Sequence, residues 1–230
     1  MGNKNLIFDE ALIKEKLFPF DSPQRISIKD DFFAPAAVLF TIREIPKKPY
    51  ELVLIHRTED GSRHAGQMSF PGGKFESDKD KSLTDTALRE TEEEIGVPRK
   101  NIKILGSLHD FPTISGYNVS PFVGVISENQ QMIKQESEVQ AIVTVPIDFF
   151  VDKRNFREES FSMNGNEHPV FYYDYADKKT NRIYTIWGAT AHLILVFIDL
   201  VYGLKISEFE LKKFRVDDLE DLKLHILNRN

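Results

Sequence analysis

The stretch 73–97 reads GKFESDKDKSLTDTALRETEEEIGV and contains one helix whose two ends are both marked in the sequence. Ser82, followed by Asp85 three residues later, makes a capping box, which predicts the start of the helix. Gly96, with Pro98 two residues beyond it, predicts the end of the helix. A helix is therefore expected between these two signals.

The charge at the end of this helix does not suit a helix built for stability. Four glutamates, Glu90, Glu92, Glu93 and Glu94, crowd its last turn and a half, where the helix dipole already places negative charge. Like charges three and four residues apart add repulsion. At about 100° per residue, Glu90, Glu93 and Glu94 share one arc of roughly 100°. Glu92 points away from them and is expected to be solvated.

Two explanations fit this trio of carboxylates. Three converging carboxylates suit a hard divalent cation such as Mg²⁺ or Mn²⁺, which prefers oxygen ligands and would remove the repulsion. A merely solvated acidic face, which is common on helices, is the alternative. A different arc, with Ala87, Leu88, Thr91 and Ile95, is expected to face the core.

Composition excludes several classes of protein. The 230 residues include 30 Lys and Arg, 36 Asp and Glu and no cysteine, with a net charge of −6. A chain of this length can bury a sizeable core, and without cysteine it has neither disulfides nor a thiolate nucleophile. The negative charge argues against binding nucleic acid by general electrostatics. An anionic substrate would need a metal ion or a few local cations.

The remaining chain predicts an α+β protein with a mixed sheet covered by helices. Short apolar runs bounded by Pro and Gly predict strands, and Asn164-Gly165 predicts a hairpin turn. The expected strands are 34–43, 51–57, 68–70, 102–108, 119–126, 138–145, 156–163 and 169–175, and the expected further helices are 9–17, 186–204 and one or two near the C-terminus.

The apolar run 186–204 has nearly the ~20 residues of a membrane span. His192 and Asp199 interrupt this run, so we expect a buried helix and no membrane partner. The first residues lack the apolar core of a secretory signal. A cytoplasmic protein is therefore expected.

Gly73 and the run 89–97 resemble the Nudix box, whose second half is Arg-Glu, an apolar residue, any residue, Glu-Glu, any residue, Gly and an apolar residue. Thr91 stands at the first apolar position. The interval from Gly73 to Arg89 is sixteen residues, against fourteen in the family, so the family's separate glutamate falls on Lys81. The candidates to replace that glutamate are Glu76, Asp78 and Asp80. The resemblance implies the Nudix fold, a mixed β-sheet sandwiched between α-helices (α/β/α).

The resemblance also implies the roles of the box residues. Glu90, Glu93 and Glu94 would hold Mg²⁺ or Mn²⁺, and Gly73 would lend a backbone carbonyl. Arg89 would orient a glutamate of the trio by a charge-assisted hydrogen bond.

The implied reaction is attack of water on the diphosphate of a nucleoside diphosphate linked to another group. Bound metal ions neutralise phosphate oxygens, lower the pKa of water and stabilise the leaving oxygen. A general base is also needed. Glu93 and Glu138 are both candidates, and the sequence does not rank them.

Flanking segments are similar to the coenzyme A pyrophosphatases, a Nudix subfamily. LIHR at 54–57 and RHAGQMSFPGGK at 63–74 precede the box, and SEV at 137–139, VP at 145–146 and IWGATA at 186–191 follow it. This resemblance implies cleavage of coenzyme A, free or acylated, to 3′-phosphoadenosine 5′-phosphate and (acyl-)4′-phosphopantetheine. The alternatives are another substrate such as ADP-ribose or NADH, and a nucleotide-binding module without turnover.

Coenzyme A carries several phosphates, so Arg57, Arg63 and Lys74 are expected phosphate partners, with ordinary surface cations as the alternative. His192 is expected in the core. Trp187 is expected to pack, with stacking on adenine as the alternative.

A single domain, 1–230, is expected. Its core would span about 32–200, with an N-terminal extension at 1–31 and a C-terminal helical extension at 201–230. A homodimer is one assembly that the sequence allows.

Overall fold

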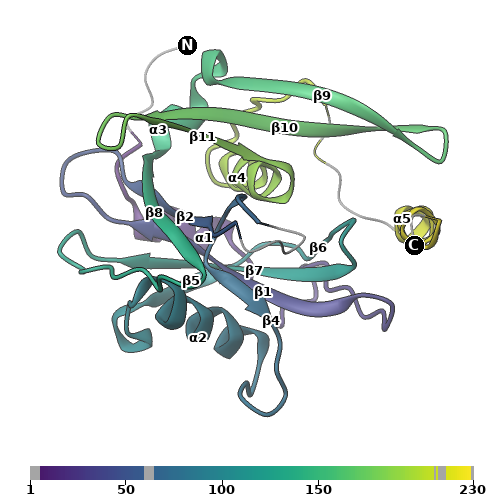
Figure 1. The fold of residues 1–230 in the computed structure, drawn as a ribbon, viewed down its shortest axis with the longest axis horizontal. Helices are drawn as coiled ribbons and strands as arrows, with labels where there is room; N and C mark the ends of the chain where they lie inside the picture. The colour runs from purple at the N-terminus through teal and green to yellow at the C-terminus, as the bar shows by residue number, and fades with distance from the viewer. Residues whose placement is uncertain (1–5, 60–64, 210, 212–215, 229–230) are drawn as a thin grey trace.

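The computed structural model describes residues 6–59, 65–209, 211 and 216–228. An eight-stranded sheet forms its centre, with one helix on one face and a second helix on the other (Figure 1). The main sheet contains β1 (Ala34–Arg43), β2 (Glu51–Arg57), β3 (Met68–Ser69), β4 (Gly72–Lys74), β5 (Lys103–Ser107), β6 (Phe111–Pro112), β7 (Tyr117–Ile126) and β8 (Val139–Pro146). The helices are α1 (Glu10–Lys16), α2 (Leu83–Ile95), α3 (Ile147–Val151), α4 (Gly188–Tyr202) and α5 (Val216–Leu227), with short 3-10 turns at Arg99–Asn101 and Lys153–Asn155.

The main sheet is mixed, as the sequence predicts. Its central strands run in the order β3-β2-β1-β7-β5, with β4 beside β1, β6 beside β7 and β8 beside β2. The β1–β7 pair is parallel, whereas β1 pairs antiparallel with β2 and β4. The α+β class, with a mixed sheet between α2 and α4, is therefore confirmed.

A second sheet lies beyond α4 (Figure 1). It contains β9 (Phe156–Met163), β10 (Asn166–Asp177) and β11 (Arg182–Trp187), in the order β11-β10-β9. The predicted hairpin is confirmed, because Asn164 and Gly165 turn it with φ angles of 51° and 82°. Strand β11 was not predicted, since its last two residues were read as the start of the apolar helix.

Side chains that alternate along the central strand β1 supply both halves of the core. Leu39 packs in the cluster of α2 with Ala87 and Ile95. Phe40 faces the opposite side and stacks on Phe197 of α4, with ring centroids 4.5 Å apart. The main sheet is thus a scaffold that fixes α2 and α4 relative to each other.

The N-terminal region before β1 is attached to this scaffold. Ile13 and Leu17 are buried in the core on the α4 side. Further on, the buried Arg25 guanidinium pairs with the Asp110 carboxylate and donates to the Leu108 carbonyl at 2.9 Å. No local pattern indicates this pair, because its two residues lie far apart along the chain.

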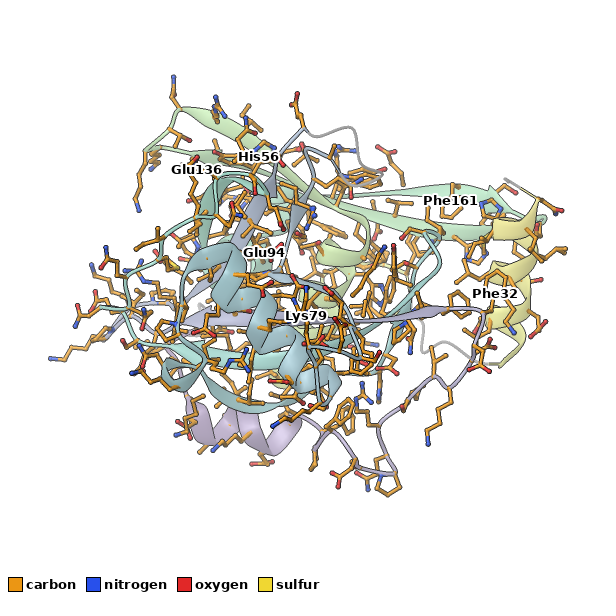
Figure 2. The ribbon with its side chains drawn as sticks, turned by 60° about the horizontal axis from the view of Figure 1, so that its bottom comes forward. Phe32, His56, Lys79, Glu94, Glu136 and Phe161 are labelled. Carbon is orange, nitrogen blue, oxygen red and sulfur yellow. The ribbon has the colours of Figure 1, made fainter. Side chains whose placement is uncertain are left out.

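The C-terminal helix α5 packs on the far end of the β9–β10 hairpin. Leu222 and Ile226 are buried there with Phe33 and Met163, and Figure 2 shows the side chains of Phe32 and Phe161 beside this helix. Within the described part of the chain, no helix is long and apolar enough to cross a membrane.

Candidate active site

Helix α2 has the boundaries that the sequence predicts. The Ser82 hydroxyl accepts a hydrogen bond from the Asp85 amide at 3.2 Å. The Asp85 carboxylate accepts from the Lys81 amide, at 3.1 Å, instead of closing the box on Ser82. At the other end Gly96 has φ 67°, and its amide donates to the Glu92 carbonyl at 3.1 Å. These local interactions set where the helix begins and ends.

The four glutamates of α2 differ strongly in exposure. The side chains of Glu94 and Glu90 are 2% and 13% exposed, whereas those of Glu93 and Glu92 are 54% and 42% exposed. Glu92 pairs with Arg99 at 3.1 Å, away from the others. The expected separation of Glu92 from the trio is therefore present.

Glu94 is a buried carboxylate with few positive partners. It accepts hydrogen bonds from the Gly72 amide at 2.9 Å and from the Arg57 guanidinium at 3.2 Å. Burial raises the pKa of Glu94 to about 8, although the Gly72 and Arg57 contacts oppose this rise. Burial also raises the pKa of Glu90. Both carboxylates would be stabilised by additional positive charge.

Arg89 holds several acids at once. Its Nη1 donates to Glu90 at 2.8 Å and to Glu93 at 3.0 Å. Its Nε and Nη2 donate to the two carboxylate oxygens of Asp80 at 2.7 and 2.9 Å. This fork fixes the orientation of the glutamates relative to the loop before the helix.

Asp80 is the acid of that loop which lies closest to Arg89, at 2.7 Å, whereas Glu76 lies 3.9 Å from the same guanidinium. The Asp80 side chain is fully buried and accepts hydrogen bonds from the Thr86 hydroxyl at 2.9 Å and the Glu76 amide at 3.0 Å. The Arg89 guanidinium holds the pKa of Asp80 well below its usual range. Of the other two candidates, Glu76 pairs with Lys79 at 2.8 Å and Asp78 is exposed. The sequence reduced the choice to three residues but could not rank them.

Gly72 and Gly73 lie in strand β4, not in a turn, and bring backbone close to the glutamates. A Cβ atom on Gly73 would lie 2.4 Å from the Glu90 carboxylate, and one on Gly72 would lie 2.3 Å from the Ala37 carbonyl. Gly72 also has a φ of 156°, which L residues rarely adopt. Position 72 therefore requires glycine, and a side chain at position 73 would displace the Glu90 carboxylate.

Glu138 reaches the same site from the turn before β8. Its carbonyl accepts a hydrogen bond from the Thr58 amide at 3.0 Å, which ties this turn to the end of β2. The side chain is exposed. Its charge adds to the effect of burial in raising the pKa of both Glu90 and Glu94. The two candidate bases, Glu93 and Glu138, therefore flank one acidic centre.

The three expected phosphate partners differ in position. Arg57 is on β2 and its guanidinium contacts Glu94. Lys74 is exposed, and its ammonium lies 5.3 Å from the centroid of the Tyr117 ring. Arg63 lies outside the described residues.

The carboxylates of this site fit a hard cation whose remaining ligands come from water and the substrate. Within the described ranges, no three acidic or histidine side chains are placed to hold a metal ion by themselves. Glu90 and Glu93 meet at Arg89, and Glu94 turns toward Gly72. Mg²⁺ is commonly bound by one or two carboxylates together with waters and substrate phosphates. The two buried carboxylates with raised pKa values match that requirement.

A pocket of about 620 Å³ lies beside the glutamates. Arg57, Gly73 and Lys74 line one part of it, and apolar side chains such as Met68 and Leu193 line another. A pocket of this size can enclose most of a nucleotide-sized ligand.

Two aromatic side chains of the α4 region have different environments. His192 packs against Phe111 and Phe171, with ring centroids 4.5 and 6.0 Å away, and burial lowers its pKa to about 4. His192 is half-buried, so its expected place in the core is only partly confirmed. Trp187 stacks on Tyr172 but is 40% exposed and borders the pocket, so the prediction of packing was only partly right.

Comparison with known proteins finds a match to the NUDIX domain model over residues 33–163. An uncharacterized Nudix hydrolase NudL from Photorhabdus laumondii is 36% identical over 172 residues, 75% of this chain and 86% of that protein. Nudix hydrolase 22, chloroplastic, from Arabidopsis thaliana is 32% identical over 209 residues, 85% of this chain and 67% of that protein. A MutT/nudix family protein from Enterococcus faecalis is similar in structure, with a TM-score of 0.47, 16% identity and coverage of 89% and 77% of the two chains.

Proposed function

The chain belongs to the Nudix hydrolase family, and on that basis we propose that it cleaves the diphosphate of coenzyme A or acyl-coenzyme A in a metal-dependent reaction. Water attacks one phosphorus, the bridging P–O bond breaks, and the leaving phosphate takes the proton that the water loses. The products are 3′-phosphoadenosine 5′-phosphate and (acyl-)4′-phosphopantetheine. The cytoplasm is the compartment that we propose, although the Arabidopsis relative is named chloroplastic.

The observation that carries this proposal is the joining of an acidic centre and a largely apolar pocket. Gly73 borders the pocket and also lies against Glu90, so a diphosphate at the glutamates can continue into the pocket. Met68, Val119 and Leu193 line the space beyond it. This arrangement supports a substrate in which a charged diphosphate is joined to a long, weakly polar arm, as in coenzyme A.

Glu90, Glu93 and Glu94, with the Gly73 carbonyl, would hold Mg²⁺ or Mn²⁺. When bound, such an ion supplies charge for the phosphate oxygens and acidifies water. Arg89 keeps Glu90 and Glu93 in place through its contacts of 2.8 and 3.0 Å.

Protein side chains supply the other parts of the reaction. Lys74, exposed beside the pocket, is the proposed phosphate partner, together with Arg57 and Arg63. Glu93 and Glu138 are both exposed enough to accept a proton from water.

The substrate is tested by a panel of coenzyme A, acetyl-coenzyme A, ADP-ribose and NADH with Mg²⁺ or Mn²⁺, with products separated by chromatography. We expect coenzyme A or its acyl form to have the highest kcat/KM. Faster turnover of ADP-ribose or NADH would overturn the choice of substrate, because the Nudix box determines the reaction and not the leaving group. Binding without turnover of any compound would favour a nucleotide-binding module.

A further inference from the structure

Three side chains form a ladder across the three-stranded sheet, which we call the stacking ladder (Arg157, Tyr172, Trp187). Tyr172 of β10 is paired in register with Arg157 of β9 on one side and Trp187 of β11 on the other. The Tyr172 and Trp187 rings are nearly parallel, at 8°, with centroids 6.1 Å apart. The Arg157 guanidinium carbon lies 4.0 Å from the Tyr172 ring centroid. The three planar groups therefore follow one another from strand to strand.

Hydrogen bonds of Arg157 fix one end of the stacking ladder. The Arg157 guanidinium also donates to Glu159 at 2.6 Å and to Asp174 at 3.4 Å. Asp174 in turn accepts from the Thr185 hydroxyl at 2.7 Å. Because these contacts join all three strands, Tyr172 is a fixed surface against which the indole rests.

Trp187 is the outermost member of the ladder. Strand β11 is an outer strand of its sheet, and the Trp187 side chain is 40% exposed although it is large and aromatic. It borders the pocket of about 620 Å³ that includes Gly73 and Lys74, and also a second pocket of about 360 Å³ formed with His56 and Met68. The indole is thus supported on one side by Tyr172 and borders ligand-sized space.

The geometry points to Trp187 as the platform on which the nucleobase of the substrate stacks. This inference rests on the proposed function insofar as the substrate carries a base attached to its diphosphate. A flat ring adds a further parallel layer to the ladder, and aromatic faces favour such offset stacking. The flexible pantetheine arm instead suits the apolar wall of the larger pocket, where Met68 and Leu193 lie. Trp187 is therefore a substrate-binding residue, and Tyr172 is a positioning residue for it.

The chain contains one tryptophan, so its indole fluorescence reports on Trp187 alone. The full-length protein is titrated with 3′-phosphoadenosine 5′-phosphate, with pantetheine and with inorganic pyrophosphate, and calorimetry records binding in parallel. We expect saturable quenching by the adenine nucleotide and none by pantetheine or pyrophosphate. Quenching by pantetheine would place the arm on Trp187 and overturn the proposal. Binding of the adenine nucleotide without quenching, or no binding of it at all, would overturn the proposal too.

This titration needs no turnover, so it separates the inference from the proposed function. A protein that binds the adenine nucleotide on Trp187 but does not hydrolyse coenzyme A upholds the platform and refutes the substrate. A protein that hydrolyses coenzyme A without a change in Trp187 fluorescence upholds the substrate and refutes the platform.

Substitutions give a second measurement. Base stacking on an aromatic side chain is typically lost with an affinity change of about five- to hundredfold, so Trp187→Leu is expected to raise KM for the cleaved nucleotide by that factor with kcat little changed. Trp187→Phe should recover most of the affinity, and Tyr172→Leu should have an intermediate effect. Phe209→Leu alters another exposed aromatic side chain, at 42% exposure, and should leave KM unchanged. A fall in kcat without a change in KM for Trp187→Leu would contradict a binding role.

Discussion

Helices α2 and α4 cover opposite faces of one sheet and differ in the kind of side chain that they bury (Figure 1). The buried residues of α4 are apolar apart from Thr190 near its start, whereas those of α2 include Arg89 and Glu94. Neither helix has a basic residue in its last turn. Near the end of α4 this absence leaves one acid, Asp199, unbalanced, whereas in α2 it leaves four glutamates beside the negative end of the helix dipole.

We propose from this difference that α4 is optimised for packing and α2 for chemistry. Burying Glu94 with its pKa raised to about 8 works against stability, and a helix that only filled space would not retain it. Departures from local design rules commonly mark functional sites. Four substitutions test this contrast, from the largest expected effect to the smallest.

Glu94→Gln is expected to have the largest effect. Removing the charge of this carboxylate should lower kcat for the hydrolysed nucleotide at least a thousandfold, equivalent to about 4 kcal/mol. The urea midpoint should stay the same or rise, because the cost of burying an ionisable carboxyl group is removed while the amide oxygen can still accept from Gly72. Steady-state kinetics and urea denaturation measure both. Glu92→Gln, on the exposed side of the same helix, is the control and should keep full activity; equal losses in the two variants would refute the assignment.

Phe197→Ala in α4 should behave in the opposite way. Phe197 is fully buried and stacks on Phe40, so its truncation should destabilise the fold by about 3–5 kcal/mol. The kcat of the folded fraction should be unchanged, because the side chain contacts none of the glutamates. Urea denaturation measures the loss in free energy of unfolding. Val196→Ala, at a half-buried neighbouring position, is the control and should lose less stability. A selective loss of kcat with a normal urea midpoint would contradict the contrast between the helices.

Asp80→Asn should lower both the stability of the fold and kcat. It leaves the Arg89 guanidinium buried against an amide, and breaking one side of a buried ion pair typically costs about 3 kcal/mol or more. We expect the free energy of unfolding to fall by about 3 kcal/mol. Because Arg89 keeps its hydrogen bonds to Glu90 and Glu93, kcat should fall less than in Glu94→Gln. Asp78→Asn, at an exposed position of the same loop, should change neither. An Asp80→Asn protein with wild-type stability would show that Arg89 does not need this anchor.

His192→Phe should have the smallest effect, and only in acid. Burial lowers the pKa of His192 to about 4 from an ordinary value of 6.5. Between these two values the unfolded chain binds more protons, so the contribution of His192 is full above pH 6.5 and is lost as the pH falls toward 4. At pH 5 the loss amounts to at most about 2 kcal/mol. Urea denaturation at pH 7.5 and pH 5 should therefore show a smaller acid loss in His192→Phe than in the wild type, and parallel losses would contradict this.

Features with local signals were predictable from the sequence. The expected strands at 34–43 and 51–57 coincide with β1 and β2, and the capping and glycine signals gave the ends of α2. The three glutamates on one face of that helix followed from the helical period alone. The period also placed Glu92 apart from them.

Features that depend on contacts between distant segments were not predictable. Arg57 contacts Glu94, 37 residues away, and Arg25 contacts Asp110, 85 residues away. Asp80 could not be distinguished from Glu76 before the fold buried Asp80 at 2.7 Å from Arg89 and left Glu76 40% exposed at 3.9 Å. Trp187 was expected to pack because an apolar helix follows it, but β11 lies at the edge of its sheet and Trp187 is 40% exposed.

We propose that the acidic face of α2 binds a divalent metal ion. The most direct measurement is the thermal unfolding temperature with and without saturating Mn²⁺ for the wild type, Glu90→Gln and Glu92→Gln. An ion that binds the native state and not the unfolded chain raises this temperature by mass action. We predict a clear rise in the wild type and in Glu92→Gln and the loss of most of that rise in Glu90→Gln. An equal rise in all three proteins, or none in the wild type, would contradict the claim.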